Sequence, residues 1–518
     1  MALRPKTVVP IRLSDAVRDA GLRPDSIDGD DVCVTGAAVD SRSIVPGDVF
    51  GAFAGLHEHG ARYATAACEA GAVAIVTDAA GRDLVRAQGL DVTVVVARSE
   101  RDALGRISGA IYGHPSRDLT VVGVTGTNGK TTTSYFIDHA LASAHERRGI
   151  MGTVELRIGD EAIESPRTTV EAPVLHGLLA RMREEGVTAA VTEVSSHAAA
   201  LDRIAGVEFD VAVFTNLQWD HLDFHHTMEE YLEAKARLFE PGRARRAVIC
   251  VDDEWTAAFA QRAPIPVETV ATRGTSQDAN WHVEDANVGL DGVGSTFTLI
   301  APDGSPHRAF SPLPGLVNVS NAAVAIVAAH AAGIGLDEAI EGVRTAHGVP
   351  GRMERVLERT DTEPLAIVDY AHTPDALTLA LEGVRPITPG KLILIFGSDG
   401  DRDRGKRPVM GVIAARLADV IVLTDENPRS EDPAEIRAQI RAGIAQVRPD
   451  LRDVHEVAPR VDAVAYGLGL GGAGDTVIVT GKGHEPTQEV AGVFYRYNDR
   501  DAFIQAHRAL TAQRKGHE

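Results

Sequence analysis

The chain has 518 residues and a formal net charge of −21, with 44% hydrophobic and 24% charged residues. This composition is typical of an ordinary globular protein with roughly three domains, and the acidic excess argues against nonspecific nucleic-acid binding, which requires cations that neutralise phosphates. Its 3 cysteines lie far apart in the sequence, so a disulfide framework or a cysteine-based metal site is not expected.

The N-terminal segment does not have the pattern of a signal peptide. Its apolar stretch is short and is interrupted by Arg12 and Asp15. The richest apolar stretch of the chain, residues 322–335, is shorter than the ~20 residues of a membrane span. We therefore expect a cytoplasmic protein that binds neither membranes nor nucleic acid.

Short β-rich runs alternate with helical stretches as far as the turn-rich HPSRD segment, residues 114–118. This alternation predicts a small α/β domain over residues 1–118. Unbroken apolar runs that end in glycine or polar residues then recur, beginning with LTVVGV after residue 118. Such runs are typical of parallel strands that are buried on both faces.

The same pattern continues to the C-terminal end of the chain. A looser stretch, about residues 265–315, predicts an antiparallel excursion, and the GVPGRME turn marks the next boundary. We therefore predict one α/β domain with a mainly parallel sheet over residues 119–347 and another over residues 348–518. Ligands bind at the carboxyl ends of strands in such sheets, which is where this sequence places its polar residues.

GVTGTNGKTTT, residues 123–133, follows a predicted strand and opens a predicted helix. Its internal glycines allow a tight turn and close approach to phosphates, Lys130 suits the β- and γ-phosphates, and Thr131 suits Mg²⁺. The first glycine of the common GxxxxGK[ST] pattern would fall at Val124, so the pattern is incomplete. The segment predicts a nucleotide site formed by Gly126, Thr127, Asn128, Gly129, Lys130, Thr131 and Thr132.

Acidic and histidine residues that could support phosphoryl transfer follow later strands. Glu193 ends one strand and is a candidate magnesium ligand. NLQWDHLDFHH, residues 216–226, suits a polar capped loop, a zinc site, or, beside a phosphate loop, a magnesium or phosphate role for His221. The helical pattern at residues 231–240 would by itself place Lys235 on the surface.

Basic residues collect near strand ends in the last third of the chain. GDRDRGKRP places four cations close together, which suits an anion site or a solvated loop. Arg429 and Glu485 follow neighbouring strands, and such a pair would suit a zwitterionic ligand whose carboxylate is held by the guanidinium.

Taken together and in order, these motifs resemble the Mur ligases of peptidoglycan synthesis. The segments that carry the resemblance are GTNGKTTT, EVSSH, NLQWDHLDFH, the helix with Lys235, NVSNAAVA, GRMERV, DYAHTPDA, GDRDRGKRP, DENPR and GKGHE. Within the family, the chain is most similar to the ligases that add the third residue of the stem peptide.

The resemblance implies a three-domain α/β architecture with a uridine-nucleotide domain, a central P-loop ATPase domain and a Rossmann-like C-terminal domain for the amino acid. It implies an ATP- and Mg²⁺-dependent ligase that adds a diamino acid, expected to be diaminopimelate, to UDP-MurNAc-L-Ala-D-Glu through an acyl phosphate. We expect the protein to be a monomer.

The resemblance also implies residue roles. Lys130, His221 and Lys235 are the implied catalytic residues, and Lys235 matches the lysine that the family carbamylates. The implied metal residues are Thr131, Glu193, His221 and carbamylated Lys235, and Asn318, Asn321, Arg352 and Asp369 match ATP-binding positions. The implied UDP-MurNAc-peptide residues are Val39, Ser41, Thr168, Thr169, Ser195 and Arg203. The implied amino-acid residues are Arg402, Asn427, Arg429, Gly481 and Glu485.

Two positions depart from the family pattern. Glu426 replaces the aspartate of the DNPR signature, which leaves lysine, ornithine or diaminobutyrate as alternatives to diaminopimelate. Leu201 stands where some relatives place a substrate-binding glutamine. A folylpolyglutamate-synthase-like ligase or another Mur enzyme would share the central domain, but the VDSR segment and the ENPR and GKGHE loops argue against it. A non-catalytic nucleotide switch would keep GTNGKTTT but would not need the His221, Lys235 and Arg402 loops together.

Overall fold

The computed structural model describes residues 3–55, 58–274, 278–289 and 294–515. The contacts between Cα atoms divide the chain into two compact units. The first comprises Met1–His282, Ala301–Gly304 and Ala323–Val343, and the second comprises Val283–Ile300, Ser305–Ala322 and Arg344–Glu518. The three-domain boundaries drawn from the sequence stay a prediction.

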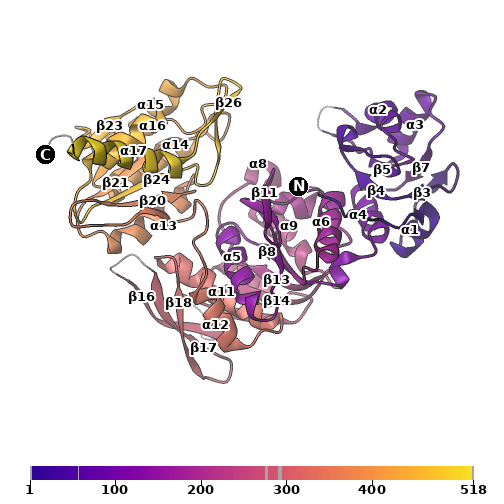
Figure 1. Cartoon of the computed structure of the whole chain (residues 1–518), viewed down its shortest axis with the longest axis horizontal. Coiled ribbons are helices and arrows are strands. Elements are labelled where there is room, and N and C mark those ends of the chain that lie inside the picture. The colour runs from indigo at the N-terminus through magenta and orange to yellow at the C-terminus, as the bar shows by residue number, and fades with distance from the viewer. Residues whose placement is uncertain (1–2, 56–57, 275–277, 290–293, 516–518) are drawn as a thin grey trace. The chain divides into compact units, whose positions relative to one another are not determined.

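The N-terminal part of the first unit contains a five-stranded sheet (Figure 1). Its strand order is β2 (Ser26–Asp28), β7 (Thr93–Val96), β6 (Ala74–Thr77), β5 (Asp48–Gly51) and β4 (Gly36–Ala38). Strands β4 to β7 are parallel, and β2 is antiparallel to β7. The apolar runs in β6 and β7 are buried throughout, as expected for parallel strands covered on both faces. The remaining elements are β1 (Ile11–Arg12), β3 (Cys33–Val34), α1 (Leu13–Asp19), α2 (Ala64–Glu69), α3 (Ala79–Ala87) and α4 (Glu100–Ile111).

The central part of the first unit is built on the predicted parallel sheet. Its strand order is β11 (Glu161–Glu164), β10 (Glu155–Ile158), β9 (Arg148–Met151), β12 (Ala189–Glu193), β8 (Thr120–Thr125), β13 (Phe209–Phe214), β14 (Ala244–Cys250) and β15 (Val267–Ala271). Six neighbouring strands are parallel, namely β9, β12, β8, β13, β14 and β15, and β10 is antiparallel to both of its neighbours, β9 and β11. The helices are α5 (Lys130–Ala140), α6 (Ala172–Glu184), α7 (Ser196–Ala200), α8 (Leu222–His225), α9 (Met228–Ala236), α10 (Glu254–Ala260) and α12 (Leu336–Arg344).

An antiparallel hairpin lies in the second unit, where β17 (Ser295–Ile300) pairs with β18 (Pro306–Ser311). It confirms part of the predicted excursion; residues 275–277 and 290–293 of that stretch lie outside the described residues. The prediction is wrong for the beginning of the stretch, because β15 is parallel to β14 and the next strand, β16 (Trp281–Val288), begins parallel to β15. The following helix is α11 (Leu316–Ala331).

The second unit contains a six-stranded sheet with the order β19 (Glu354–Leu357), β20 (Leu365–Asp369), β24 (Thr476–Thr480), β21 (Leu392–Phe396), β22 (Val420–Leu423) and β23 (Val454–Glu456). Strands β20 to β23 and β24 are parallel, and only β19 among the described strands of this sheet is antiparallel. The other elements are α13 (Pro374–Val384), α14 (Lys406–Leu417), α15 (Pro433–Val447), α16 (Arg460–Leu470), α17 (Asp499–Lys515), β25 (Thr487–Val490) and β26 (Val493–Arg496).

Alternate residues of β21 explain how this sheet is covered. Leu392 and Leu394 pack into a core with α13, α14 and α15, whereas Ile393 and Ile395 pack into a core with α16 and α17. Because successive side chains of a strand point to opposite faces, an unbroken apolar strand requires helices on both faces. The α/β prediction for this part of the chain is confirmed.

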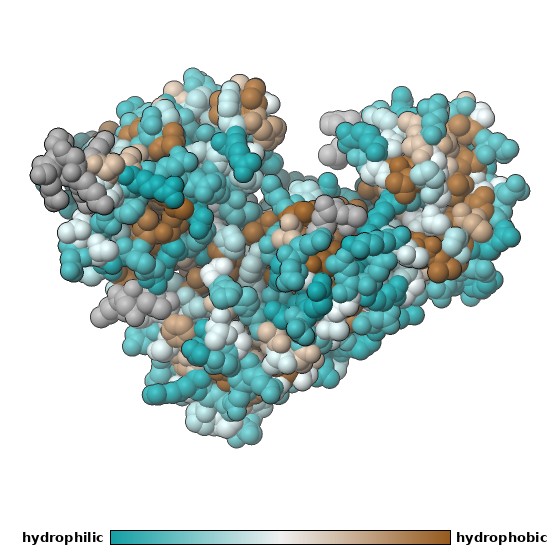
Figure 2. Space-filling model, in the orientation of Figure 1, coloured by the Kyte–Doolittle hydropathy of each residue, from teal (hydrophilic) through white to brown (hydrophobic). Residues whose placement is uncertain are grey.

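The surface of the described residues is mainly polar on the face drawn in Figure 2. Among the described residues, no helix is long and apolar enough to cross a bilayer. Exposed apolar side chains include Trp219, which is 74% exposed, and Phe494 on β26, which is 66% exposed.

Candidate nucleotide and amino-acid sites

The glycine-rich loop joins β8 to α5 in the predicted arrangement. Gly126 and Gly129 have φ angles of 147° and 83°, a region that side chains rarely allow. A Cβ atom on Gly126 would also collide with the Thr215 hydroxyl. The loop therefore needs glycine at these positions, and the first turn of α5 presents backbone N–H groups that suit phosphate.

Two lysines donate hydrogen bonds to carbonyl oxygens of this loop. Lys130 Nζ lies 2.9 Å from Gly126 O and 2.8 Å from Thr127 O. Lys235 Nζ, on α9, lies 2.7 Å from the same Gly126 O. The two predicted catalytic lysines therefore meet at one carbonyl group.

Lys235 is buried, with 1% of its surface exposed. The helical pattern alone predicted that this lysine lies on the surface, and that prediction is wrong. Its ammonium group lies 4.5 Å above the ring of Tyr231. Burial, together with the positive charge of Lys130, holds the pKa of Lys235 well below its ordinary value. A depressed pKa favours the neutral amine, which is the nucleophilic form.

Glu193 lies at the carboxyl end of β12 and is 1% exposed. Its Oε2 accepts a hydrogen bond from Thr131 Oγ1 at 3.1 Å. Thr153 donates its backbone N–H to Oε1 and its hydroxyl to Oε2, both at 2.9 Å. Thr131 and Glu193 therefore lie side by side as the sequence predicted. Thr153 carries no motif of its own and was missed.

His221 directly precedes α8 and has a left-handed conformation, with a φ angle of 54°. Its ring packs against His197 with a centroid separation of 4.9 Å. Burial, assisted by the positive charges of Lys130 and Lys235, lowers the pKa of His221 despite the opposing charge of Asp220. Among the residues that the structure describes, no group of three or more histidine, cysteine or acidic side chains is placed to hold a metal ion, so no zinc site is found there.

Four of the residues predicted to contact UDP-MurNAc-peptide are linked to one another or to Glu193 by hydrogen bonds, in the case of Thr168 through Thr153 and in the case of Arg203 through Thr169 O. The Thr169 hydroxyl donates to Glu193 O at 2.8 Å and accepts from Ser195 N at 3.0 Å. Thr168 Oγ1 accepts from the Thr153 hydroxyl at 3.1 Å. Arg203 pairs with Glu171 at 3.0 Å, a partner that sequence reasoning did not identify.

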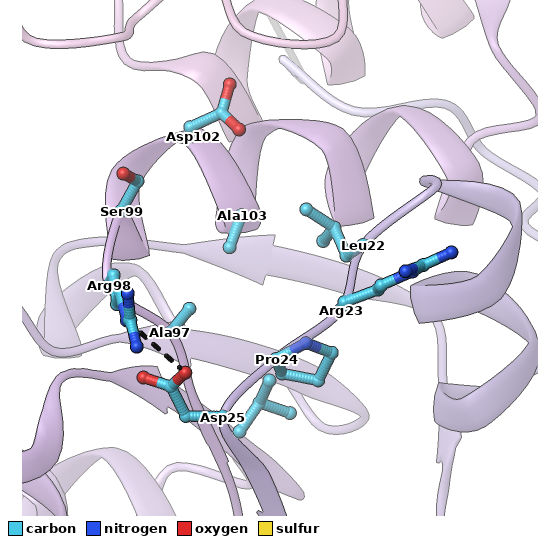
Figure 3. A pocket seen from close by; sticks show the side chains of 10 residues that line it. Leu22, Arg23, Pro24, Asp25, Ala97, Arg98, Ser99, Asp102 and Ala103 are labelled. Atoms are coloured by element: carbon cyan, nitrogen blue, oxygen red, sulfur yellow. Dashed lines mark ion pairs between the residues drawn. The ribbon is translucent and has the colours of Figure 1, made fainter.

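The other two, Val39 and Ser41, follow β4 at one edge of the N-terminal sheet. A separate cavity of about 310 Å³ lies at the carboxyl end of β7 (Figure 3). There Arg98 and Asp25 point toward one another at 3.5 Å. Strands β5 and β6 separate β4 from β7, which corresponds to roughly 14 Å at ~4.8 Å per strand, so the predicted residues do not form this cavity.

The remaining predicted nucleotide residues lie in the second unit. Asn318 and Asn321 are one turn apart on α11, and Asn321 Nδ2 donates to Asn318 Oδ1 at 3.2 Å. The Arg352 guanidinium lies 4.1 Å above the ring of Tyr370. Asp369 accepts backbone N–H groups at both oxygens, and its burial raises its pKa.

The predicted amino-acid residues follow β21, β22 and β24 of the second unit. Asn427 Nδ2 donates to Glu485 Oε2 at 3.1 Å, which joins the ENPR and GKGHE loops. Arg429 lies between two carboxylates, 3.5 Å from Asp399 and 3.9 Å from Glu489. Both acids were missed, because neither belongs to a motif.

Gly481 and Glu426 are in close contact within the same group of loops. Gly481 has a φ angle of 113°, and a Cβ atom there would lie 2.6 Å from Glu426 Oε2. Glu426 is 2% exposed, and its burial raises its pKa to about 8. Its Oε2 has no hydrogen-bond partner among the described residues. The residue that departs from the family signature therefore lies inside the predicted amino-acid site.

The four cations of GDRDRGKRP do not act as one cluster. Arg407 is fully buried and pairs with Glu431 at 2.9 Å, and Arg404 reaches the same carboxylate at 3.1 Å. Lys406 Nζ donates to His372 O at 2.9 Å. Arg402 is exposed, and no ion pair or side-chain hydrogen bond to another described residue is found for it. A composition signal detects the charge of this loop but not which cation a ligand would meet.

Comparisons with known proteins cover nearly the whole chain. A family model for the Mur ligase middle domain matches residues 124–329, and one for the Mur ligase, glutamate ligase domain matches residues 351–483. A UDP-N-acetylmuramoyl-L-alanyl-D-glutamate–2,6-diaminopimelate ligase of Streptomyces avermitilis is 47% identical over 91% of this chain and 92% of its own. A UDP-N-acetylmuramyl-tripeptide synthetase of Leifsonia xyli is 44% identical over 96% of both chains. A solved UDP-N-acetylmuramoyl-L-alanyl-D-glutamate–2,6-diaminopimelate ligase aligns with a TM-score of 0.68 and 33% identity, over 97% of this chain and 100% of its own.

Proposed function

The chain belongs to the Mur ligase family, and from this premise we propose that it adds 2,6-diaminopimelate to UDP-N-acetylmuramoyl-L-alanyl-D-glutamate in an ATP-dependent, ADP-forming reaction. The amino-acid substrate named for similar ligases supports diaminopimelate, and the similarity extends through the N-terminal part of the chain. The cytoplasmic location and the monomeric state stay predictions.

The proposed ATP-dependent step is supported mainly by the group of side chains around the glycine-rich loop. Lys130 and Lys235 meet at Gly126 O, and Thr131 bonds Glu193 at the next strand end. A carboxylate reacts poorly with an amine, so its oxygen must first attack the γ-phosphorus of ATP, which releases ADP and gives an acyl phosphate. The amine then attacks the acyl carbon and phosphate leaves. Lys130 would neutralise charge as two anions approach each other.

The oxygen atoms of Thr131 and Glu193 suit Mg²⁺, which prefers oxygen ligands and usually shares them with nucleotide phosphates. We propose that these residues hold the ion, with His221 and carbamylated Lys235 nearby. Bound Mg²⁺ would supply charge neutralisation at the phosphates. The buried amine of Lys235 supports carbamylation, because a neutral amine can add to CO₂ and lose a proton to give an anionic carbamate.

We propose that the second unit binds the amino acid through Arg402, Asn427, Arg429, Gly481 and Glu485. The residues Asn318, Asn321, Arg352 and Asp369 are proposed to bind nucleotide. The residues proposed for UDP-MurNAc-peptide are Val39, Ser41, Thr168, Thr169, Ser195 and Arg203. The joining of Asn427 to Glu485 supports this assignment, because it places an amide donor and a carboxylate acceptor in one small group.

ADP release tests the proposal. The full chain should release ADP only when ATP, UDP-MurNAc-L-Ala-D-Glu and diaminopimelate are all present, and Lys130→Ala should lower this rate at least ~100-fold. ADP release without an amino acid or the muramoyl dipeptide would contradict the ligase proposal. A parallel panel of lysine, ornithine and diaminobutyrate tests the amino acid, because Glu426 leaves these substrates as alternatives.

A further inference from the structure

Lys482 occupies a buried position between two residues of the proposed amino-acid site. The side chain is 0% exposed. Its Nζ donates to Asn427 Oδ1 at 2.8 Å and to Glu485 Oε2 at 2.7 Å. Since Asn427 Nδ2 also donates to Glu485 Oε2, the three side chains form a closed network across two loops.

The loop geometry directs Lys482 into this network. Gly481 and Gly483, on either side of it, have φ angles of 113° and 52°. A Cβ atom on Gly483 would lie 2.8 Å from Gly351 O and 2.9 Å from the Tyr370 side chain. The GKGHE loop is therefore closely packed, and the lysine lies inside it rather than in solvent.

The network determines which atoms of Asn427 can meet a ligand. Asn427 Oδ1 accepts both Lys482 Nζ and the backbone N–H of Glu489, the latter at 3.2 Å. These two donors fix the amide with its NH₂ group toward Glu485. One N–H of Asn427 bonds Glu485, and the other, for which no acceptor is found among the described residues, can donate to a carboxylate.

The same network divides the two oxygens of Glu485. Oε2 accepts from Lys482 and Asn427, whereas Oε1 accepts no hydrogen bond from the described residues. The side chain is 32% exposed, so Glu485 is accessible where Lys482 is not. Oε1 can therefore accept a ligand ammonium while Oε2 anchors the carboxylate.

We propose that Lys482 is a positioning residue that holds Asn427 as a donor and Glu485 as an acceptor for the zwitterionic amino acid. The inference rests on the proposed function. Lys482 does not touch the substrate; it acts by fixing two groups that do. Without it, Asn427 can rotate and Glu485 loses a charge-assisted hydrogen bond, so the two groups no longer present a fixed pair to the ammonium and carboxylate.

Steady-state kinetics of the full chain test this inference with Lys482→Met. The KM for diaminopimelate, or for the best substrate of the amino-acid panel, should rise about 10- to 100-fold, which corresponds to the loss of about one charge-assisted hydrogen bond between the site and the amino acid when Asn427 and Glu485 are no longer held in place. The KM values for ATP and for UDP-MurNAc-L-Ala-D-Glu should change less than about 2-fold. A variant with all three KM values raised together, or with none raised, would overturn the inference.

Two further variants separate positioning from a general effect on folding. Arg448→Met removes a cation that bonds backbone carbonyls of Ala415 and Asp419, next to the amino end of β22, and should leave all three KM values unchanged. Lys482→Met should raise the amino-acid KM by a smaller factor in an Asn427→Ala background than in the unmodified chain, because part of its effect acts through Asn427 and the rest through Glu485. Independent, multiplicative effects would contradict the inference.

If Lys482→Met does not fold, Lys482→Gln replaces it in the same measurements, since its amide can still donate to Asn427 and should give a smaller increase in the amino-acid KM. The positioning role would be contradicted if Lys482→Gln raised the KM values of all three substrates, by as much as is expected for Lys482→Met. Failure of the proposed function is distinguishable, because the unmodified chain would then release no ADP with any amino acid of the panel.

Discussion

The buried ion pair between Arg460 and Asp499 should contribute strongly to the stability of the second unit. Both side chains are 0% exposed, and the guanidinium donates to both carboxylate oxygens at 2.8 Å. Arg460 also donates to Thr480 O at 2.8 Å and to Asp425 O at 3.3 Å, so it ties the ends of β22 and β24 to α17. These are the strands that the ENPR and GKGHE loops follow.

Removing either partner leaves an uncompensated charge in a site without water access. We expect Arg460→Met and Asp499→Leu each to lower the free energy of opening of this unit by about 3–5 kcal/mol. The double variant should lose much less than the sum of the two, because both charges are removed together. Comparing the single variants with the double variant therefore separates two free energies, the attraction between the two charges and the cost of burying one charge without its partner.

Native-state hydrogen exchange of the full chain measures this effect. The protected amides of β22 and β24 should exchange roughly 100- to 4,000-fold faster in each single variant, at one factor of ten per ~1.4 kcal/mol. Amides of β8, in the first unit, serve as the internal control and should keep their rates. Single variants that accelerate exchange less than ~10-fold, or a double variant equal to the sum of the singles, would refute the reasoning.

Three further predictions concern ionisable groups. Lys235→Ala should reduce ligase turnover at least ~100-fold, and added acetate should restore part of it by supplying the missing carboxylate; steady-state assays with and without acetate check this, and unchanged turnover without rescue would remove the carbamate proposal. Burial raises the pKa of Glu426 from 4.5 to about 8, so the folded chain retains a proton that the unfolded chain loses, and the stability from this group disappears as pH rises through 8. Between about pH 7 and 9, thermal or urea unfolding should show that the free energy of unfolding falls by about 1.4 kcal/mol less in Glu426→Gln than in the unmodified chain. Equal pH dependence of the free energy of unfolding in the two proteins would contradict the raised pKa of Glu426. Burial lowers the pKa of His176, whose Nε2 lies 2.9 Å from Ala205 O, from 6.5 to about 4, so its stability contribution is lost as pH falls from 6.5 through 4. His176→Gln keeps a hydrogen-bond donor but does not titrate, so the decrease in the free energy of unfolding between pH 6.5 and 4 should be smaller in this variant, by at most about 3 kcal/mol. The same decrease in the variant and in the unmodified chain would contradict this prediction.

The parallel sheets could be predicted because their signal is local. Each of the runs at β8 and β21 is continuous, apolar and ended by glycine or polar residues, and a strand of this kind can bury both faces only between two layers of helices. The glycine-rich loop was predictable for a similar reason, since the need for positive φ at Gly126 and Gly129 is expressed in the residue type itself.

The partners of the charged residues could not be predicted, because they lie far apart in the sequence. The helical pattern around Lys235 gives no sign of Gly126 O, which is 109 residues away and is its hydrogen-bond acceptor. Likewise, the GDRDRGKRP segment does not show that Arg407 forms an ion pair with Glu431, a residue on another loop. Composition predicts how many cations a segment carries, whereas packing decides which are available to a ligand.

The meeting of Lys130 and Lys235 at one carbonyl group connects burial to chemistry. Burial is the larger cause of the depressed pKa of Lys235, and the repulsion between its ammonium group and that of Lys130 at the same Gly126 O lowers the pKa further. Conversion of Lys235 to a carbamate would turn this repulsion into attraction and would place an anion beside the phosphate loop. Lys130 would then remain the positive charge at the loop, so that one local cation faces the nucleotide in a chain whose net charge is −21. The burial of Lys235 is unfavourable for an ordinary lysine and is favourable for one that reacts, which is why its position argues for a chemical role rather than a structural one.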